Sequence, residues 1–156
     1  MLQIRTYQPG DRDAVWELHV IALESVGVYL GNGPRDDDLY HIEAVYLQNG
    51  GEFFVGISDG RLVAMGALKR ISDERAEIKR MRVHPDCQRR GFGQTMLTAL
   101  EVRARELGYH SLQLDTTTLQ IGAQRLYEKN GYVEVRRGKV AQFECIYYEK
   151  TLSDSQ

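Results

Sequence analysis

The sequence of 156 residues contains only two cysteines, three prolines and four histidines. Cys87 and Cys145 form no paired-spacing motif, so we expect two free thiols, as in a reducing cytoplasm, rather than a disulfide. The histidines show no metal-ligand spacing with one another or with the cysteines, so we expect no metal. No linker composition, low-complexity tract or internal repeat divides the chain, and residues 1–156 are predicted to form a single domain.

Long apolar runs and an excess of basic charge are also missing. No uninterrupted apolar stretch approaches the ~20 residues that cross a bilayer. Residues 1–10 lack the basic stretch and apolar core of a secretory signal, so a cytoplasmic protein without membrane partners is expected. The formal net charge of −2 disfavours a nucleic-acid-binding domain, which would present a broad basic face.

Apolar periodicity predicts the order of the secondary-structure elements. Strands are expected at residues 2–7, 53–58, 61–71, 77–83, 111–115, 132–137 and 141–151, and helices at 11–27, 36–47, 91–107 and 119–130. The Asp59-Gly60 turn signal requires antiparallel pairing, whereas the strand–helix–strand unit over 77–115 requires a right-handed parallel crossover. The expected fold is therefore α/β (α+β), with a mixed, mostly antiparallel central sheet and helices on both faces.

The segment between strand 77–83 and helix 91–107 carries an anion-binding pattern. Gly91 and Gly93 let a phosphate approach the backbone at a helix start, where free amides point outward, and Arg89 and Arg90 add positive charge. Glycines that merely ease the turn are an equally good explanation of the pattern alone. Two other phosphate motifs are excluded. Met96 stands where a dinucleotide fingerprint needs a third Gly or Ala, and no Gly-Lys-Ser/Thr of a Walker loop is present.

Two motifs together resemble the GNAT superfamily of N-acetyltransferases. Gln88-Arg-Arg-Gly-Phe-Gly93 resembles the pyrophosphate loop of the superfamily, and Leu126-Tyr-Glu-Lys-Asn-Gly-Tyr132 resembles its second signature. The predicted order of elements agrees with this superfamily over nearly the whole chain.

The resemblance implies transfer of an acetyl group from acetyl-coenzyme A (acetyl-CoA) to a primary amine of a small molecule or peptide, by direct attack in a ternary complex. It implies a splayed pair of parallel strands at 77–83 and 111–115, with the pantetheine arm between them. The residues implied to contact the coenzyme are Met81, Arg82, Val83, Gln88, Arg89, Arg90, Gly91, Phe92, Gly93, Gln94, Gln120 and Tyr127. Gln120 replaces the asparagine of many members, so its longer side chain leaves this contact open.

Two residues are implied to move protons. Tyr127 is expected to donate a hydrogen bond to the departing thiolate; a core tyrosine is the alternative. Glu77 matches the general base of histone-type members; pairing with Lys79 or Arg80 is the alternative. Alternation along the strand puts Glu77 on the same face as Met81, about 13 Å away at ~3.3 Å per residue, unless a bulge intervenes.

The acceptor site is expected between the first two helices and the last hairpin. Tyr29 is expected to line it, and Arg80 and Arg82 to hold a substrate carboxylate if they face the cleft. The acidic run at 36–38 forms either a wall for a cation or, by a slight preference, a solvated helix start. A non-catalytic acyl-CoA sensor on the same fold is the alternative function. The aromatic-rich last strand is compatible with pairing across a homodimer or with an internal place in the sheet.

Overall fold

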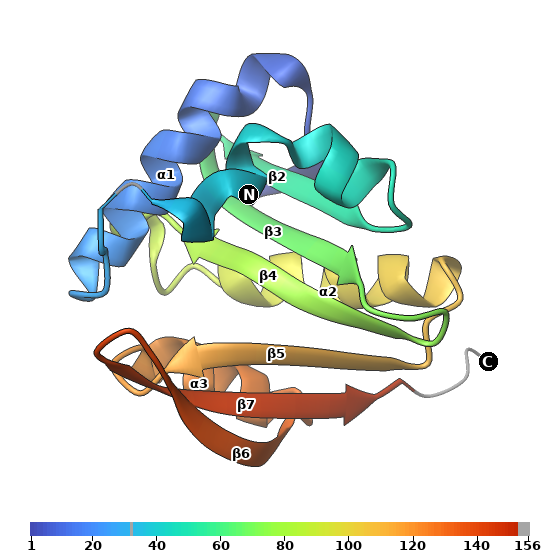
Figure 1. The fold of residues 1–156 in the computed structure, drawn as a ribbon. Coiled ribbons are helices and arrows are strands. Elements are labelled where there is room, and N and C mark those ends of the chain that lie inside the picture. The colour runs from blue at the N-terminus through green and yellow to red at the C-terminus, as the bar shows by residue number, and fades with distance from the viewer. Residues whose placement is uncertain (32, 153–156) are drawn as a thin grey trace.

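The structure of the protein is a computed structural model, which describes residues 1–31 and 33–152 (Figure 1). Its strands are β1 (Gln3–Thr6), β2 (Glu52–Ser58), β3 (Arg61–Arg70), β4 (Arg75–Val83), β5 (Ser111–Thr117), β6 (Val133–Val140) and β7 (Phe143–Thr151). They form a seven-stranded sheet in the order β1-β2-β3-β4-β5-β7-β6. Only the pairing of β4 with β5 is parallel, which confirms the mixed, mostly antiparallel sheet.

Helices cover both faces of this sheet, as predicted (Figure 1). The long ones are α1 (Arg12–Ser25), α2 (Phe92–Glu106) and α3 (Ile121–Lys129), and short turns are η1 (Pro9–Asp11), η2 (Pro34–Tyr40), η3 (Glu43–Leu47) and η4 (Pro85–Cys87). One core lies between the sheet and α1, η2 and η3, and the other between the sheet and α2 and α3. No helix of the described residues is long and apolar enough to cross a membrane.

β7 occupies an internal place in the sheet. It pairs with β5 along one edge and with β6 along the other. Both rows of its backbone hydrogen-bonding groups are therefore used within the chain. This position explains its aromatic residues, and β7 offers no free edge for pairing across a dimer.

The predicted helix over 36–47 is wrong. The segment forms a 3₁₀ helix, η2, followed by one turn of π-helix, η3. With three residues per turn, η2 places Asp36 and Leu39 on the same buried side. A regular helix start would leave these acidic residues in water, whereas here contacts with the sheet hold two of them inside.

β4 and β5 pair for only a short distance. The parallel ladder joins Arg75–Glu77 to Ser111–Gln113, and beyond it β5 continues beside β7 alone. The backbone groups of β4 that follow Glu77 therefore have no strand partner on the β5 side. This separation is the splayed parallel pair that the sequence predicted.

A bulge in β4 changes which side chains share a face. Lys79 pairs with Ala67 and Arg82 with Met65, so two residues of β4, Arg80 and Met81, oppose Gly66 alone. Arg80 takes a φ of +60°, which is costly for a residue with a side chain. A Cβ at Gly66 would lie 2.9 Å from Met81 Sδ, so any other residue would require the methionine side chain to shift.

The expectation that Glu77 and Met81 share a face is therefore wrong. Ala67 and Met65 belong to the core beneath α1, so their partners Lys79 and Arg82 lie on the α1 face, as does Glu77, which pairs with Lys69. Met81 and Val83 pack instead against the core beneath α2. The extra residue shifts the alternation by one position.

Arg80 is held in its unusual conformation by acidic partners on η2. Its Nε donates to Asp38 Oδ2 over 2.9 Å, Nη1 lies 3.4 Å from Asp36 Oδ1, and Nη2 donates to the Arg35 carbonyl over 2.7 Å. Tyr46 donates its hydroxyl hydrogen to Asp38. Burial opposes ionisation of Asp38, but Arg80 and Tyr46 outweigh it and lower the pKa of this carboxyl. The preferred interpretation of the acidic run as a solvated helix start is thus wrong for Asp36 and Asp38.

We expect Asp38→Ala to lower the free energy of unfolding by about 2–4 kcal/mol, because it leaves the Arg80 guanidinium buried with too few partners. Asp37→Ala is the matched control. Asp37 is exposed, so its loss should change stability by about 0.5 kcal/mol or less. Urea unfolding of the three proteins at neutral pH measures both values. Equal, small losses in the two variants would contradict the structural role of Asp38.

Candidate active site

Two cavities open where β4 and β5 separate. The loop cavity, about 420 Å³, lies between the segment preceding α2, the end of α1 and the start of α3. The hairpin cavity, about 220 Å³, lies between the segment preceding η2, β4, β5 and the β6–β7 hairpin. The residues on the walls of both are Met81, Arg82, Gln120, Ala123 and Tyr127. The two cavities therefore meet at one place, around the side chain of Tyr127.

The loop cavity gathers the residues that the sequence predicted for the coenzyme. All of them line it except Arg90. Gly91 precedes α2 with a φ of +78°, and no side chain caps the helix. The first amides of α2 are thus free of a side-chain cap at the positive end of the helix dipole. This arrangement fits an anionic group such as a pyrophosphate.

Two carbonyls of β4 already accept hydrogen bonds from side chains. Arg82 Nη1 donates to the Met81 carbonyl over 2.9 Å, and Gln88 Nε2 donates to the Val83 carbonyl over 3.1 Å. A carbonyl oxygen has two lone pairs, so each retains capacity for a second donor. These bonds also explain why Gln88 belongs to the loop motif, since its amide ties the loop to the strand.

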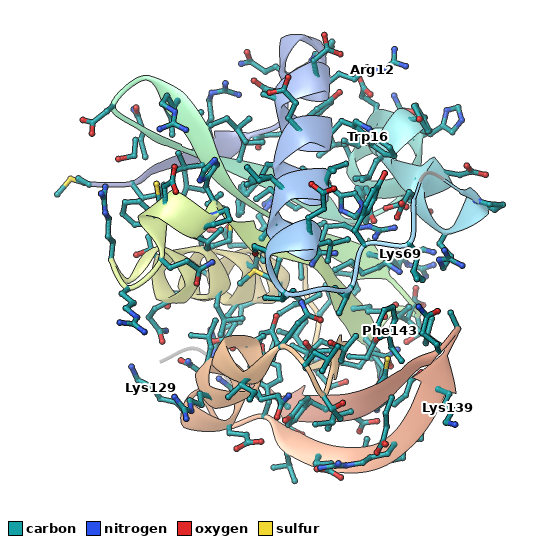
Figure 2. The ribbon with its side chains drawn as sticks, turned by 90° about the vertical axis from the view of Figure 1, so that its left-hand side faces the viewer. Arg12, Trp16, Lys69, Lys129, Lys139 and Phe143 are labelled. Carbon is teal, nitrogen blue, oxygen red and sulfur yellow. The ribbon has the colours of Figure 1, made fainter. Side chains whose placement is uncertain are left out.

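The sequence missed a side-chain contact that joins the two signature motifs. Gln94 Nε2 donates to Asn130 Oδ1 over 2.9 Å, and Asn130 Nδ2 donates back to Gln94 Oε1 over 2.8 Å. This amide pair fixes the start of α2 against the end of α3. Lys129 also lines the loop cavity and was not predicted. Figure 2 shows Lys129, the last residue of α3, and Phe143, the first residue of β7, on opposite sides of the lower part of the molecule.

Tyr127 is the central side chain of the site. It is buried on α3, in ring contact with Tyr132 at 5.8 Å between centroids. Burial raises the pKa of Tyr127 to about 12, although the nearby positive charge of Arg82 lowers it. Within the described residues its hydroxyl makes no hydrogen bond, and both cavities reach this side chain. Tyr127 is thus a protonated donor available to a ligand at neutral pH.

Gln120 is partly committed to the protein. Its Oε1 accepts hydrogen bonds from Thr117 N over 3.2 Å and Thr117 Oγ1 over 3.0 Å, just before α3 begins. Its Nε2 makes no hydrogen bond within the described residues, and the residue lines both cavities. A donor, rather than an acceptor, is therefore what this residue offers to a ligand.

Glu77 does not line either cavity. Burial raises the pKa of Glu77, the positive charge of Lys79 lowers it, and the negative charge of Asp115 raises it. Within residues 1–31 and 33–152 it forms no ion pair with Lys79 or Arg80. Asp115 does line the hairpin cavity and was not predicted, because a lone aspartate at a strand end carries no signal in the sequence.

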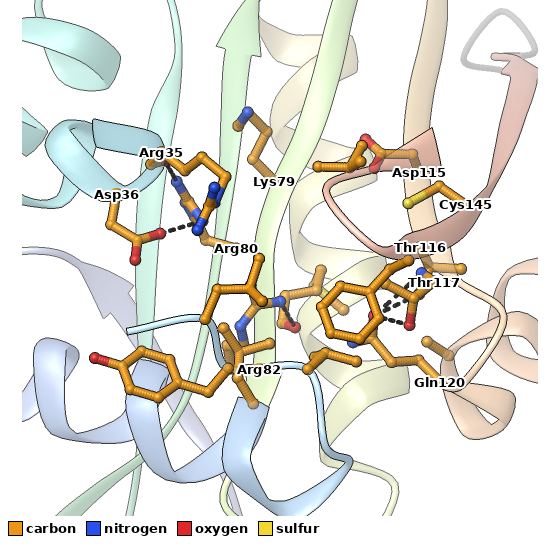
Figure 3. A pocket seen from close by; sticks show the side chains of 18 of the residues that line it. Arg35, Asp36, Lys79, Arg80, Arg82, Asp115, Thr116, Thr117, Gln120 and Cys145 are labelled. Carbon is orange, nitrogen blue, oxygen red and sulfur yellow. Dashed lines mark hydrogen bonds and ion pairs between the residues drawn. The ribbon is translucent and has the colours of Figure 1, made fainter. Parts of the chain in front are cut away.

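The hairpin cavity is lined by the three residues predicted for the acceptor, Tyr29, Arg80 and Arg82. Figure 3 labels the two arginines. Arg80, however, points its guanidinium at η2, where Asp36 and Asp38 engage it. Arg82 differs: its Nε is buried and has no hydrogen-bond partner. Phe143, from the last hairpin where the acceptor site was expected, also lines this cavity, whereas Lys79 and Cys145 line it and were not predicted.

Both cysteines are free and buried, as expected. Cys87 lines the loop cavity and Cys145 the hairpin cavity. Burial and the negative charge of Asp115 raise the pKa of Cys145, which disfavours its thiolate and a nucleophilic role. In the part of the chain that the structure describes, no group of His, Cys, Asp and Glu side chains is arranged to hold a metal ion.

Comparison with known proteins agrees with this geometry. The model of the Acetyltransferase (GNAT) family matches residues 13–132, which include every element of both cavities except the β6–β7 hairpin. The chain belongs to this family. IAA acetyltransferase of Azospirillum brasilense is 31% identical over 132 residues, which are 79% of this chain and 79% of that protein.

Two further members bear on the fold and on the extent of the match. N-acetyltransferase 8 of Homo sapiens is 30% identical over 101 residues, 61% of this chain but only 44% of the human protein. The chain thus matches less than half the length of that relative. The structure of yncA from Salmonella typhimurium, solved with its cofactor acetyl-CoA, superposes with a TM-score of 0.81 at 20% identity, covering 100% of this chain and 96% of yncA. The fold of this GNAT member is therefore the same.

We expect Gly91→Ala to weaken binding of coenzyme A about tenfold, because a residue with a Cβ costs roughly 1–2 kcal/mol in the left-handed conformation and turns the amides away. Gly108→Ala is the matched control. Gly108 has a φ of +91°, and a Cβ there would also meet nothing within 4 Å. Calorimetric titration should show weaker binding in Gly91→Ala alone, although both variants lose stability. Equal affinities in both variants would mean that the start of α2 does not bind the coenzyme.

Proposed function

We propose that the protein transfers the acetyl group of acetyl-CoA to a primary amine of a small molecule or peptide, by direct attack within a ternary complex. The observation that carries this proposal is the position of Tyr127 on the wall common to both cavities. A donor from one cavity and an acceptor from the other would meet beside its hydroxyl.

The loop cavity supplies the groups that hold the coenzyme. The amides at the start of α2 bind the pyrophosphate, with Arg89 beside them. The backbone of β4 that follows Glu77 binds the pantetheine amides, since β5 leaves that edge unpaired. The presence of acetyl-CoA in yncA, which has the same fold, supports this assignment.

Acetyl-CoA supplies a thioester, and the chain supplies donors on both sides of it. A backbone N–H near Met81 polarises the thioester carbonyl. Tyr127 donates a hydrogen bond to the sulfur as the C–S bond breaks and the C–N bond forms. With the pKa of Tyr127 near 12, the hydroxyl keeps its proton at neutral pH and serves as a donor throughout.

The proton of the attacking amine requires an acceptor. Glu77 lies on the α1 face of β4, the face that borders the hairpin cavity, but not on the cavity wall. It therefore acts through a water rather than by direct contact. Because its pKa is raised, Glu77 is a stronger base than a solvated carboxylate. A stronger base is better suited to accept the proton of the amine.

The test is amine-dependent release of free thiol from acetyl-CoA, measured with a panel of amines, amino acids and peptides. Tyr127→Phe should lower kcat about 100-fold or more, because it removes the donor to the leaving group. Its stability and the thermal shift caused by acetyl-CoA should be unchanged, because the hydroxyl has no protein partner in the described residues. Tyr147→Phe, a half-buried tyrosine on β7, is the control and should keep full activity.

Three results would count against the proposal. Full activity in Tyr127→Phe would remove the tyrosine from the chemistry. Stabilisation by acetyl-CoA without thiol release from any acceptor would favour the non-catalytic acyl-CoA sensor. No stabilisation at all would mean that the loop cavity does not bind the coenzyme.

We expect Glu77→Gln to lower kcat/KM about 100-fold at neutral pH and to alter the pH profile. In the wild type, a protonated Glu77 cannot accept the amine proton, so kcat/KM should fall as the pH drops through its raised pKa. This fall of kcat/KM at low pH should be absent in Glu77→Gln. It should be present in Glu74→Gln, the control, because Glu74 is exposed. Loss of this fall in Asp115→Asn, but not in Glu77→Gln, would assign the base to Asp115 instead.

A further inference from the structure

Arg82 carries a largely buried positive charge that no carboxylate contacts directly within the described residues. Its Nη1 donates to the carbonyl of the neighbouring Met81, and its Nε is buried without a partner. In the described residues it forms no ion pair. Burial and the charge of Arg80 lower the pKa of Arg82 to about 10, so it is still protonated at neutral pH. A buried guanidinium without a carboxylate is costly unless a ligand supplies one.

The charged side chains of the hairpin cavity differ in whether the protein already pairs them. Asp36 and Asp38 pair directly with Arg80, and they act on Arg82 only from a distance, raising its pKa less than burial lowers it. Lys79 lines the same wall and, within the described residues, makes no ion pair. Figure 3 shows Arg82 on the cavity wall between Asp36 on one side and Gln120 on the other. Arg82 and Lys79 are thus cations of this wall that make no ion pair in the described residues, and Asp115 is an acidic residue on the same wall.

The position of Arg82 limits the distance, within the acceptor, between the anionic group that Arg82 binds and the amine that is acetylated. Arg82 lines both cavities, as Tyr127 does, and it is close enough for its positive charge to lower the pKa of Tyr127. The acetyl group must be beside Tyr127 if this tyrosine donates to the sulfur. An anion bound to Arg82 is then only a few bonds from the attacking nitrogen. In an α-amino acid a single carbon separates the amine from the carboxylate.

We infer that the acceptor is an α-amino acid whose carboxylate is bound by Arg82. This inference rests on the proposed function and specifies its substrate class. A planar guanidinium can bind a carboxylate through two parallel N–H donors, which a point charge such as an ammonium cannot do. Lysine side chains, polyamines and peptide N-termini present no carboxylate next to the amine, and they would leave Arg82 unpaired.

The test compares matched acceptors: α-amino acids, their amides, the corresponding amines without the carboxylate, and Nα-acetyl-lysine. Wild-type kcat/KM should favour the acid over its amide by about 100-fold, the size expected when a buried charge loses its partner. Arg82→Gln should reduce this preference to about threefold or less, mainly by lowering the rate with the acid. Arg82→Lys keeps the charge and should retain part of the preference.

Folding and coenzyme binding are measured in the same variants. Thermal unfolding with and without acetyl-CoA shows whether Arg82→Gln still folds and binds the coenzyme. If amides, amines or Nα-acetyl-lysine are acetylated as well as the acids, the inference is overturned and the acetyltransferase stands. An equal loss on acids and amides in Arg82→Gln also overturns it, because Arg82 would then serve the thioester or the fold. No acetylation of any acceptor, with no stabilisation by acetyl-CoA, would overturn the proposed function itself.

Discussion

The bulge at Arg80 and Met81 in β4 is the constraint on which the rest of the site depends. Without the extra residue, Arg82 would lie on the α2 face and Met81 on the α1 face. The bulge places Arg82 on the wall of the hairpin cavity and packs Met81 into the core beneath α2. Arg80 takes the strained conformation that the bulge requires, and its contacts with Asp36 and Asp38 offset the cost.

The same contacts also shape the acceptor side. They hold η2 against β4, and Tyr29, which precedes η2 in the chain, lines the same hairpin cavity. On the coenzyme side, the amide pair of Gln94 and Asn130 fixes the start of α2 against α3, which carries Tyr127. Two separate polar contacts thus hold the two cavities against one common wall. Each of these contacts is sensitive to the loss of one partner, because the remaining polar group stays buried without a hydrogen-bond partner.

The sequence predicted most of the fold, and nearly all of the residues that it assigned to the coenzyme line the loop cavity. Strands and long helices follow from apolar periodicity, and the loop from Gln88 to Gly93 is continuous in the chain, so its residues arrive together. The acceptor side is assembled from distant segments, and sequence spacing says little about it.

The helix expected at 36–47 failed because Arg80, far along the chain, attracts Asp36 and Asp38. The prediction of the side of β4 on which Met81 lies was wrong, because no residue type in β4 indicates a bulge. Lys79, Asp115 and Phe143 belong to no sequence motif, and only the fold places them together on the wall of the hairpin cavity.

The central claim is that the separated strands deliver the acetyl group to Tyr127 and Arg82. A crystal structure with acetyl-CoA tests it most directly. The account predicts the thioester carbonyl within hydrogen-bonding distance of a backbone N–H near Met81. It also predicts the sulfur beside the Tyr127 hydroxyl and the methyl group directed toward the hairpin cavity. A thioester bound away from Tyr127, or a hairpin cavity sealed from it, would contradict the account.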